Sequence, residues 1–153
     1  MKSLGFLALF FFLTTTVLVY KFVVVGEVTE NYDGRTAVVV SQNEVNYIRE
    51  EMRVFLKSFH EITAGISSGN YEMIEKAAHR SGKYVRDHAP GTLVGKIPLR
   101  FKSLGFDTQD RFDELAESAK AHKDTQFLLS ELSGIMKNCA ACHNSYTFSV
   151  VEP

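Results

Sequence analysis

The chain has 153 residues, a formal net charge of −1 at pH 7 and 45% hydrophobic residues, with three prolines and no tryptophan. These values are typical of one ordinary globular domain and exclude a disordered chain. The nearly balanced charge indicates no basic surface, so we expect no nucleic-acid partner.

The N-terminal segment is apolar: between Leu4 and Val25 only Lys21 is charged. As a helix this segment would be about 33 Å long, enough to span a hydrocarbon core if Lys21 extends to the interface. The run is longer than the roughly 7–15 apolar residues of a signal peptide, and "VVG" ending at Gly26 is a poor cleavage site. Residues 1–26 are therefore predicted as an uncleaved membrane anchor. We expect an inner-membrane protein with its domain in the periplasm; cleavage would instead release a soluble periplasmic domain.

A linker is expected at residues 27–40, in which "TAVVV" at 36–40 is interpreted as an extended lead-in. Helical signals begin directly after it. Ser41 and Glu44 form a capping-box pattern, and Gly69 marks the end of a first helix. Its apolar residues are spaced by three and four, which predicts one buried face: Val45, Ile48, Met52, Phe55, Phe59, Ile62 and Ile66.

Three more helices are predicted. Asn70 caps the second, whose inner stripe would be Ile74, Ala77, Ser81, Val85 and His88, ending before "APG" at 89–91. Pro98 and Gly105 would open and close a single helical turn. The third helix starts near Asp107 or Thr108, with Phe112, Leu115, Ala116 and Ala119 inward, and the fourth starts near Asp124. The predicted fold class is all-α: over residues 41–153, an antiparallel four-helix bundle preceded by a transmembrane helix.

The segment "KNCAACHNSY" at 137–146 holds the only two cysteines of the chain. They continue the apolar stripe of the fourth helix, which reads Leu128, Leu132, Ile135, Cys139, Cys142 and Tyr146. On a helix Cys139 and His143 are one turn apart, with Cys142 beside them, so we expect all three on one inward strip. This pattern is typical of covalent haem attachment, in which two thioethers hold the porphyrin and the histidine binds the iron.

Other interpretations of the two cysteines are weaker. A thioredoxin-like dithiol needs a βαβ context, which the sequence does not show. A structural zinc site needs further ligands. A disulfide across "CAAC" would close a very small ring and would stabilise the fold little.

An all-helical chain with "CAACH" near the C-terminal end of its last helix resembles the cytochrome c-prime family and its low-spin relatives. The resemblance covers residues 41–148. It implies a haem c in the bundle, with thioethers at Cys139 and Cys142 and His143 as the proximal iron ligand. In that family an arginine of the first helix is followed within a turn by the residue that faces the iron, which here would be Arg49 followed by Met52. Tyr146 is followed by "TFSVVEP", where the family often has a basic patch for a redox partner.

For the residues expected on the distal side of the haem, the sequence leaves more than one role open. Met52 is the only methionine on the inner stripe of the first helix, and it is either an iron ligand or a hydrophobic side chain of the core. Arg49 and Arg53 either pair with the haem propionates or lie on a solvated face. The remaining histidines, His60, His79, His88 and His122, are expected on exposed faces, with His88 as the first alternative iron ligand.

The expected function is one-electron transfer through a covalently bound haem. A five-coordinate haem that binds or senses a small gas such as nitric oxide is the alternative, and the ligand role of Met52 separates the two. A non-haem interaction bundle on a membrane tether is the third class. No catalytic constellation is visible, since the carboxylates of "DELAE" at 113–117 are typical of a solvated helix face, so we expect no enzyme. The redox partner, and whether the chain forms a homodimer, stay open.

Overall fold

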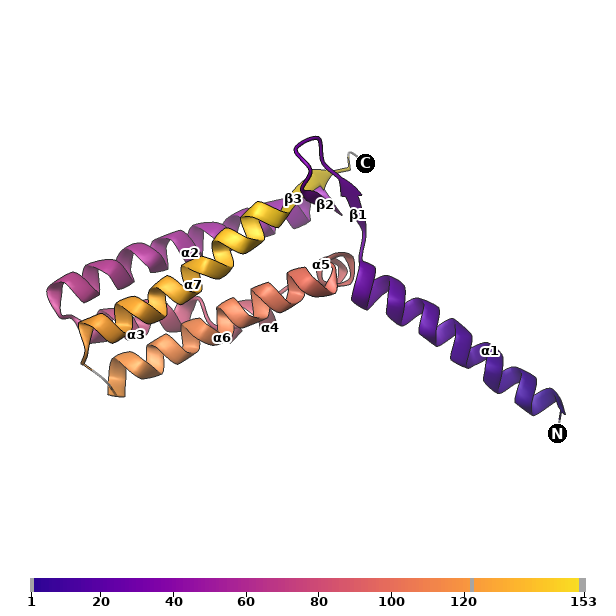
Figure 1. The fold of residues 1–153 in the computed structure, drawn as a ribbon, viewed down its shortest axis with the longest axis horizontal. Coiled ribbons are helices and arrows are strands. Elements are labelled where there is room, and N and C mark those ends of the chain that lie inside the picture. The colour runs from indigo at the N-terminus through magenta and orange to yellow at the C-terminus, as the bar shows by residue number, and fades with distance from the viewer. Residues whose placement is uncertain (1, 122, 152–153) are drawn as a thin grey trace.

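The structure, a computed structural model, describes residues 2–121 and 123–151. It is mostly helical, with one small sheet (Figure 1). The elements, in chain order, are α1 (Lys2–Val19), the π-helical turn η1 (Tyr20–Val25), β1 (Val28–Glu30), β2 (Thr36–Val40), α2 (Gln42–Ser68), α3 (Tyr71–Arg80), α4 (Lys83–Asp87), α5 (Gly91–Lys96), α6 (Leu99–Ala121), α7 (Thr125–Ser145) and β3 (Tyr146–Val150).

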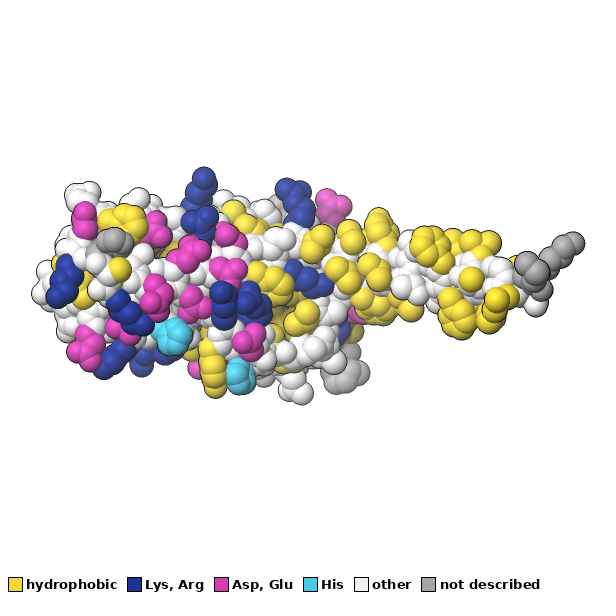
Figure 2. Space-filling model, turned by 90° about the horizontal axis from the view of Figure 1, so that it is seen from below, with side chains coloured by type: hydrophobic (Ala, Val, Ile, Leu, Met, Phe, Trp, Pro, Cys, Tyr) yellow, Lys and Arg dark blue, Asp and Glu magenta, His cyan; other side chains and the backbone are white. Residues whose placement is uncertain are grey.

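The N-terminal helix projects from the rest of the molecule (Figure 1). Its segment Ser3–Val25, 23 residues long, is long and apolar enough to cross a membrane, although a signal sequence would meet the same description. Hydrophobic side chains cover it, whereas the body carries intermixed positive and negative groups (Figure 2). Lys21 is exposed, and its Nζ donates a hydrogen bond to the Gly26 carbonyl at 3.0 Å.

The segment expected as a linker, residues 27–40, contains two strands: the extended lead-in expected at 36–40 is β2, and β1 is an addition to that expectation. β1 pairs antiparallel with β2 through a turn at Gly34, whose φ is +81°, and β2 pairs in parallel with β3. Val38 and Val40 of β2 are fully buried. The partner strand β3 follows the last helix, more than a hundred residues away in sequence, and such distant pairing has no local signal in the sequence.

Four helices share the larger core. α2, α3, α6 and α7 each contribute buried residues to it, and Phe112 of α6 lies at its centre. The ring centroids of Phe55 and Phe59, on α2, lie 5.6 and 5.4 Å from that of Phe112. The inward positions expected on α6 are confirmed: Phe112, Leu115, Ala116 and Ala119 are at most 1% exposed.

The predicted boundaries of α2 are confirmed. The Ser41 hydroxyl accepts from the Glu44 backbone amide, and the Glu44 carboxylate accepts from that of Ser41, which is the reciprocal capping box. Gly69 ends the helix in the left-handed conformation, and the Asn70 side chain caps α3 by accepting from the Met73 amide.

The second predicted helix is interrupted. α3 ends at Arg80, and α4 begins at Lys83. The chain leaves helical geometry at Gly82, which lies against the side chain of Asp113 on α6: a Cβ at Gly82 would come within 1.9 Å of the Asp113 carboxylate. That carboxylate also accepts from the Lys83 amide at 3.0 Å. The break therefore depends on a contact with a distant helix, which the local pattern does not contain.

The third helix begins earlier than predicted. α6 starts at Leu99, directly after Pro98, and continues through Gly105. Pro98 therefore opens a helix as expected, but Gly105 does not close it. A glycine inside a helix costs only about 1 kcal/mol, which the tertiary packing of the rest of α6 can offset.

We predict an acid-sensitive link between α2 and α5. Glu44 is buried, and Lys96 Nζ lies 2.7 Å from its carboxylate. Burial alone would raise the Glu44 pKa, but bonds from Lys96, Ser41 and Thr92 outweigh it and lower the pKa to about 2. Because this pKa lies below that of the unfolded chain, the stabilisation is present above about pH 4.5 and is lost as the pH falls through about 2.

Chemical denaturation across this pH range measures the link. Glu44→Gln should lower the free energy of unfolding at pH 7 by about 2 kcal/mol and should flatten its decline below pH 5. Glu50→Gln is the matched control, because the Glu50 side chain is 64% exposed. An unchanged acid profile in Glu44→Gln would contradict the prediction.

Candidate haem-attachment site

The two cysteines and His143 occupy the last two turns of α7. The helix starts as predicted, because the Asp124 carboxylate accepts from the backbone amides of Gln126 and Phe127. Its buried stripe consists of Leu128, Leu132 and Ile135. Beyond Ile135, Cys139 and Cys142 are only half-buried, and His143 is exposed. All three residues were expected to lie inward. The two cysteines do so in part, and His143 does not.

Both cysteines are free thiols. Burial raises the pKa of Cys139, and burial together with the neighbouring Cys139 sulfur raises that of Cys142 to about 11. Both are therefore protonated at neutral pH. A redox-active or metal-binding cysteine pair has a lowered pKa. Moreover, within residues 2–121 and 123–151 no group of three or more His, Cys, Asp or Glu side chains is placed to hold a metal ion. The raised thiol pKa values disfavour the redox-dithiol interpretation.

A stretch of α6 runs antiparallel alongside the motif. At one end Asn138, just before Cys139, donates to the Asp107 carboxylate at 2.5 Å. At the other end the ring centroids of Phe101 and Tyr146 are 5.0 Å apart. The residues between Phe101 and Asp107 therefore face the turns that carry Cys139 and Cys142.

The buried residues form two separate clusters, and the motif lies between them. One cluster is the helical core around Phe112, and the other surrounds the sheet and includes Val38, Ile48 and Leu93. On α7 the cysteines fall between Ile135, in the first cluster, and Phe148 of β3, which packs on the second. On α2, Met52 lies between Ile48, which belongs to the second cluster, and Phe55, which packs on the first. Along their own helices, Met52 and the two cysteines each lie between residues of the two clusters.

Two polar residues of α6 are buried between the residues that it contributes to the two clusters. Phe101 belongs to the sheet cluster and Phe112 to the helical core. Between them Thr108 and Gln109 are buried, and Gln109 Oε1 has no hydrogen-bond partner in the described part of the chain. A buried acceptor without a partner is costly. Half-buried thiols and a thioether are residue types that fit the apolar ring of a haem.

The residues predicted for the distal side lie on the outer part of α2. Met52 is 37% exposed, in contrast to its stripe neighbour Ile48 at 8%. Arg49 and Arg53 are exposed, and Arg53 forms an ion pair with Glu50. The Arg53 contact therefore favours the solvated-face interpretation over a role in binding propionates.

The other histidines lie on the surface as expected, and His122 lies outside the described residues. His60, His79 and His88 are exposed. His88, which the sequence placed at the end of an inward stripe, instead stacks on Tyr84 with 4.0 Å between ring centroids. It follows the break between α3 and α4, which turns the stripe away from the core.

Arg35 is a residue of this region that the sequence analysis missed. It lies at the start of β2, and its Nη1 donates to the carbonyls of His143 at 3.2 Å and Tyr146 at 3.4 Å. Asp33 holds the guanidinium in place through Nε and Nη2, and these bonds keep the Asp33 pKa far below its usual value. Arg35 thus places a positive charge at the C-terminal end of α7, where it complements the helix dipole. A "DGR" turn is the only local signal in the sequence.

Arg35→Gln should loosen the end of α7 that carries the motif. The backbone amide of Tyr146, which donates to the Cys142 carbonyl, is expected to exchange with solvent faster, and Arg35→Lys should restore part of its protection with a single donor group. Amide hydrogen exchange followed by mass spectrometry measures this. Arg53→Gln, which removes an exposed ion pair on α2, is the control. Equal exchange of the Tyr146 amide in Arg35→Gln and wild type would show that Arg35 does not stabilise the end of α7.

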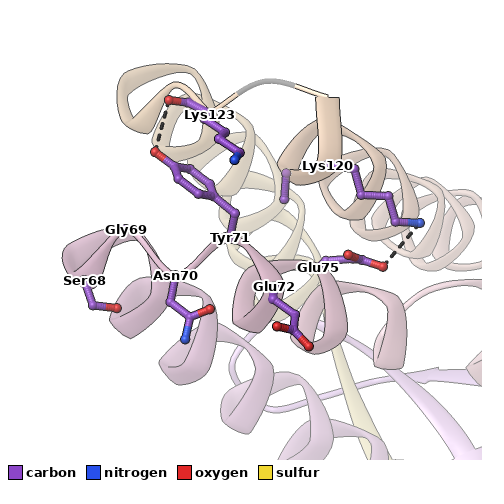
Figure 3. A pocket seen from close by; sticks show the side chains of 9 residues that line it. Ser68, Gly69, Asn70, Tyr71, Glu72, Glu75, Lys120 and Lys123 are labelled. Carbon is purple, nitrogen blue, oxygen red and sulfur yellow. Dashed lines mark hydrogen bonds and ion pairs between the residues drawn. The ribbon is translucent and has the colours of Figure 1, made fainter.

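A hollow at the opposite end of the helices does not form a second candidate site. It is lined by the α2–α3 turn and the end of α6 (Figure 3). Its polar groups pair with one another: the Tyr71 hydroxyl donates to the Lys123 carbonyl at 3.0 Å, and Lys120 lies 3.3 Å from Glu75. The candidate site is therefore the one around the cysteines.

No protein family model, no curated protein and no solved structure matches the chain.

Proposed function

We propose that the protein is a membrane-anchored c-type cytochrome that transfers single electrons through one covalently bound haem. Helices α2, α3, α6 and α7 would form a four-helix bundle of the cytochrome c-prime type around it. Cys139 and Cys142 would hold the porphyrin, and His143 would be the proximal ligand. The bound iron would supply the one-electron redox chemistry.

The observation that carries the proposal is the position of "CAACH" in the fold. The two thiols lie along α7 between residues of the two buried clusters, and Met52 lies along α2 between residues of the same two clusters. Haem attachment adds each thiol across a vinyl group of the porphyrin, which consumes the S–H bond and needs no oxidant. The thiol state of both cysteines suits this addition.

The chain's own residues would do two things for the haem. The apolar side chains of Phe101 and Phe55, which border the two clusters, would exclude water from the ring. Arg35, through the carbonyls of His143 and Tyr146, would hold the segment that carries the proximal ligand.

The proposed location is the periplasmic side of the inner membrane. The support is the apolar helix Ser3–Val25, together with the requirement that c-type haem be attached to an exported chain.

A second function, binding or sensing of a small gas such as nitric oxide, is supported by one observation. Met52 is 37% exposed, so its thioether is not fixed by packing, and an iron without a sixth ligand would be open to gas. Electron transfer is preferred because Met52 continues the sequence spacing of Ile48 and Phe55 on α2.

The test is expression of the full chain together with a c-type haem maturation system. The denatured protein band should show haem peroxidase staining, and the intact mass should equal polypeptide plus one haem. Absorption spectra of the oxidised and reduced forms should be those of a c-type haem. A colourless band with the bare polypeptide mass would refute the proposal and favour a membrane-tethered interaction bundle.

A further inference from the structure

The end of the N-terminal helix is packed against the start of α6. Lys102, in the first turns of α6, is only 8% exposed. Its Nζ donates to the carbonyls of Phe22 at 3.1 Å and Val23 at 3.3 Å, in the final turn of the apolar helix. Burial lowers the pKa of this amine. A buried amine that loses its acceptors is strongly destabilising, so the fold depends on those two carbonyls.

Gly26 allows the two segments to approach closely. It is buried, with φ of +73°, and a Cβ here would lie 2.1 Å from the Lys96 carbonyl oxygen and 2.9 Å from Pro98 N. The next residue, Glu27, donates its backbone amide to the same Lys96 oxygen at 2.7 Å. Only glycine fits both this conformation and this spacing. The chain therefore leaves the apolar helix as a packed part of the domain.

The haem motif lies at this same end of the domain. β1 begins two residues after Gly26 and pairs with β2, which pairs with β3, and β3 begins three residues after His143. Two strand spacings separate β1 from β3, a distance of about 10 Å. Figure 1 shows the sheet, α5 and the C-terminal end of α7 gathered where the apolar helix joins the body.

We propose that Lys102 and Gly26 dock the membrane anchor rigidly onto the domain and so hold the motif end of the domain toward the membrane surface. The haem part of this inference rests on the proposed function. A domain on a flexible tether could turn to meet a soluble electron carrier. A docked domain presents its haem end near the bilayer, which fits a redox partner that is itself embedded in the membrane.

Hydrogen exchange of the Glu27 amide tests the docking and needs no haem. The full chain is reconstituted in phosphatidylcholine nanodiscs, and exchange is followed in wild type, Gly26→Ala and Lys102→Met. The amide should be protected in wild type and should exchange about tenfold faster in both variants. The matched control is Gly34→Ala, because Gly34 also has a positive φ but a Cβ there would have nothing within 4 Å. Its Glu27 amide should behave as in wild type.

Energy transfer from a headgroup-labelled lipid to the haem tests the orientation. Quenching of the dye should be strong in wild type and in Gly34→Ala, and weaker in Gly26→Ala and Lys102→Met. Wild-type exchange at Glu27 as fast as that at the fully exposed Tyr32, or quenching that is equal in all four proteins, would overturn the inference. A colourless protein with a protected Glu27 amide would sustain the docking and refute the proposed function.

Discussion

Replacing both Cys139 and Cys142 with alanine should abolish covalent haem. The denatured double variant should give no haem stain, and its mass should equal that of the bare polypeptide, because no other cysteine exists in the chain. Each single variant should keep one thioether and should shift the absorption maximum of the reduced protein to longer wavelength, since one vinyl group then stays conjugated with the ring. Haem staining, intact mass and the reduced spectrum together measure the effect.

The control for these variants lies inside the motif. Ala141→Ser changes an exposed position between the cysteines and should leave the staining, the mass added by the haem and the spectrum unchanged. His143→Ala should retain both thioethers but lose the proximal ligand, which separates attachment from iron coordination. Haem retained on the denatured double variant would show that the cysteines are not the attachment points.

Met52→Ala should convert a low-spin iron to a high-spin iron. If the Met52 sulfur is the sixth ligand, the oxidised wild type shows the weak near-infrared band of methionine coordination and binds carbon monoxide slowly. The variant should lose that band, bind carbon monoxide about tenfold faster or more, and have a lower reduction potential, because a thioether stabilises ferrous iron. Absorption spectroscopy, flash photolysis and redox titration measure these changes.

Met73→Ala is the matched control, since Met73 has the same 37% exposure but lies on α3. It should leave the spin state unchanged. A wild type that is already high-spin and binds gas rapidly would show that Met52 is packing only, and the gas-binding function would then be preferred. A low-spin spectrum that survives Met52→Ala would point to a histidine ligand, with His88 the first to replace.

Local signals were sufficient where the structure depends on neighbours in sequence. The capping box at Ser41 and Glu44, the left-handed end at Gly69 and the cap at Asn70 are all present. Each involves atoms within a few residues, so the sequence contains the whole interaction. The inward faces of α6 and of the first turns of α7 were predicted for the same reason, because helical periodicity alone places Phe112 and Ile135 on one side.

Predictions failed where distant segments meet. Gly82 breaks a helix because Asp113 lies against it, and Gly105 is tolerated because the rest of α6 is held by its packing. β2 has its parallel partner in β3, at the other end of the chain. None of these contacts is encoded within a local window.

The same distinction between local and distant contacts applies to the candidate site. The spacing of Cys139, Cys142 and His143 defines the haem hypothesis from sequence, since covalent attachment needs only those residue types at that spacing on a helix. Their surroundings required the tertiary structure: the separation of the core into two clusters on either side of the motif and the Arg35 bonds to the end of α7. Likewise hydropathy identified the apolar helix, but only the packed chain brought Lys102 to the carbonyls of Phe22 and Val23, about eighty residues earlier. Periodicity and capping act between neighbours, whereas burial and close approach arise only when distant segments pack together.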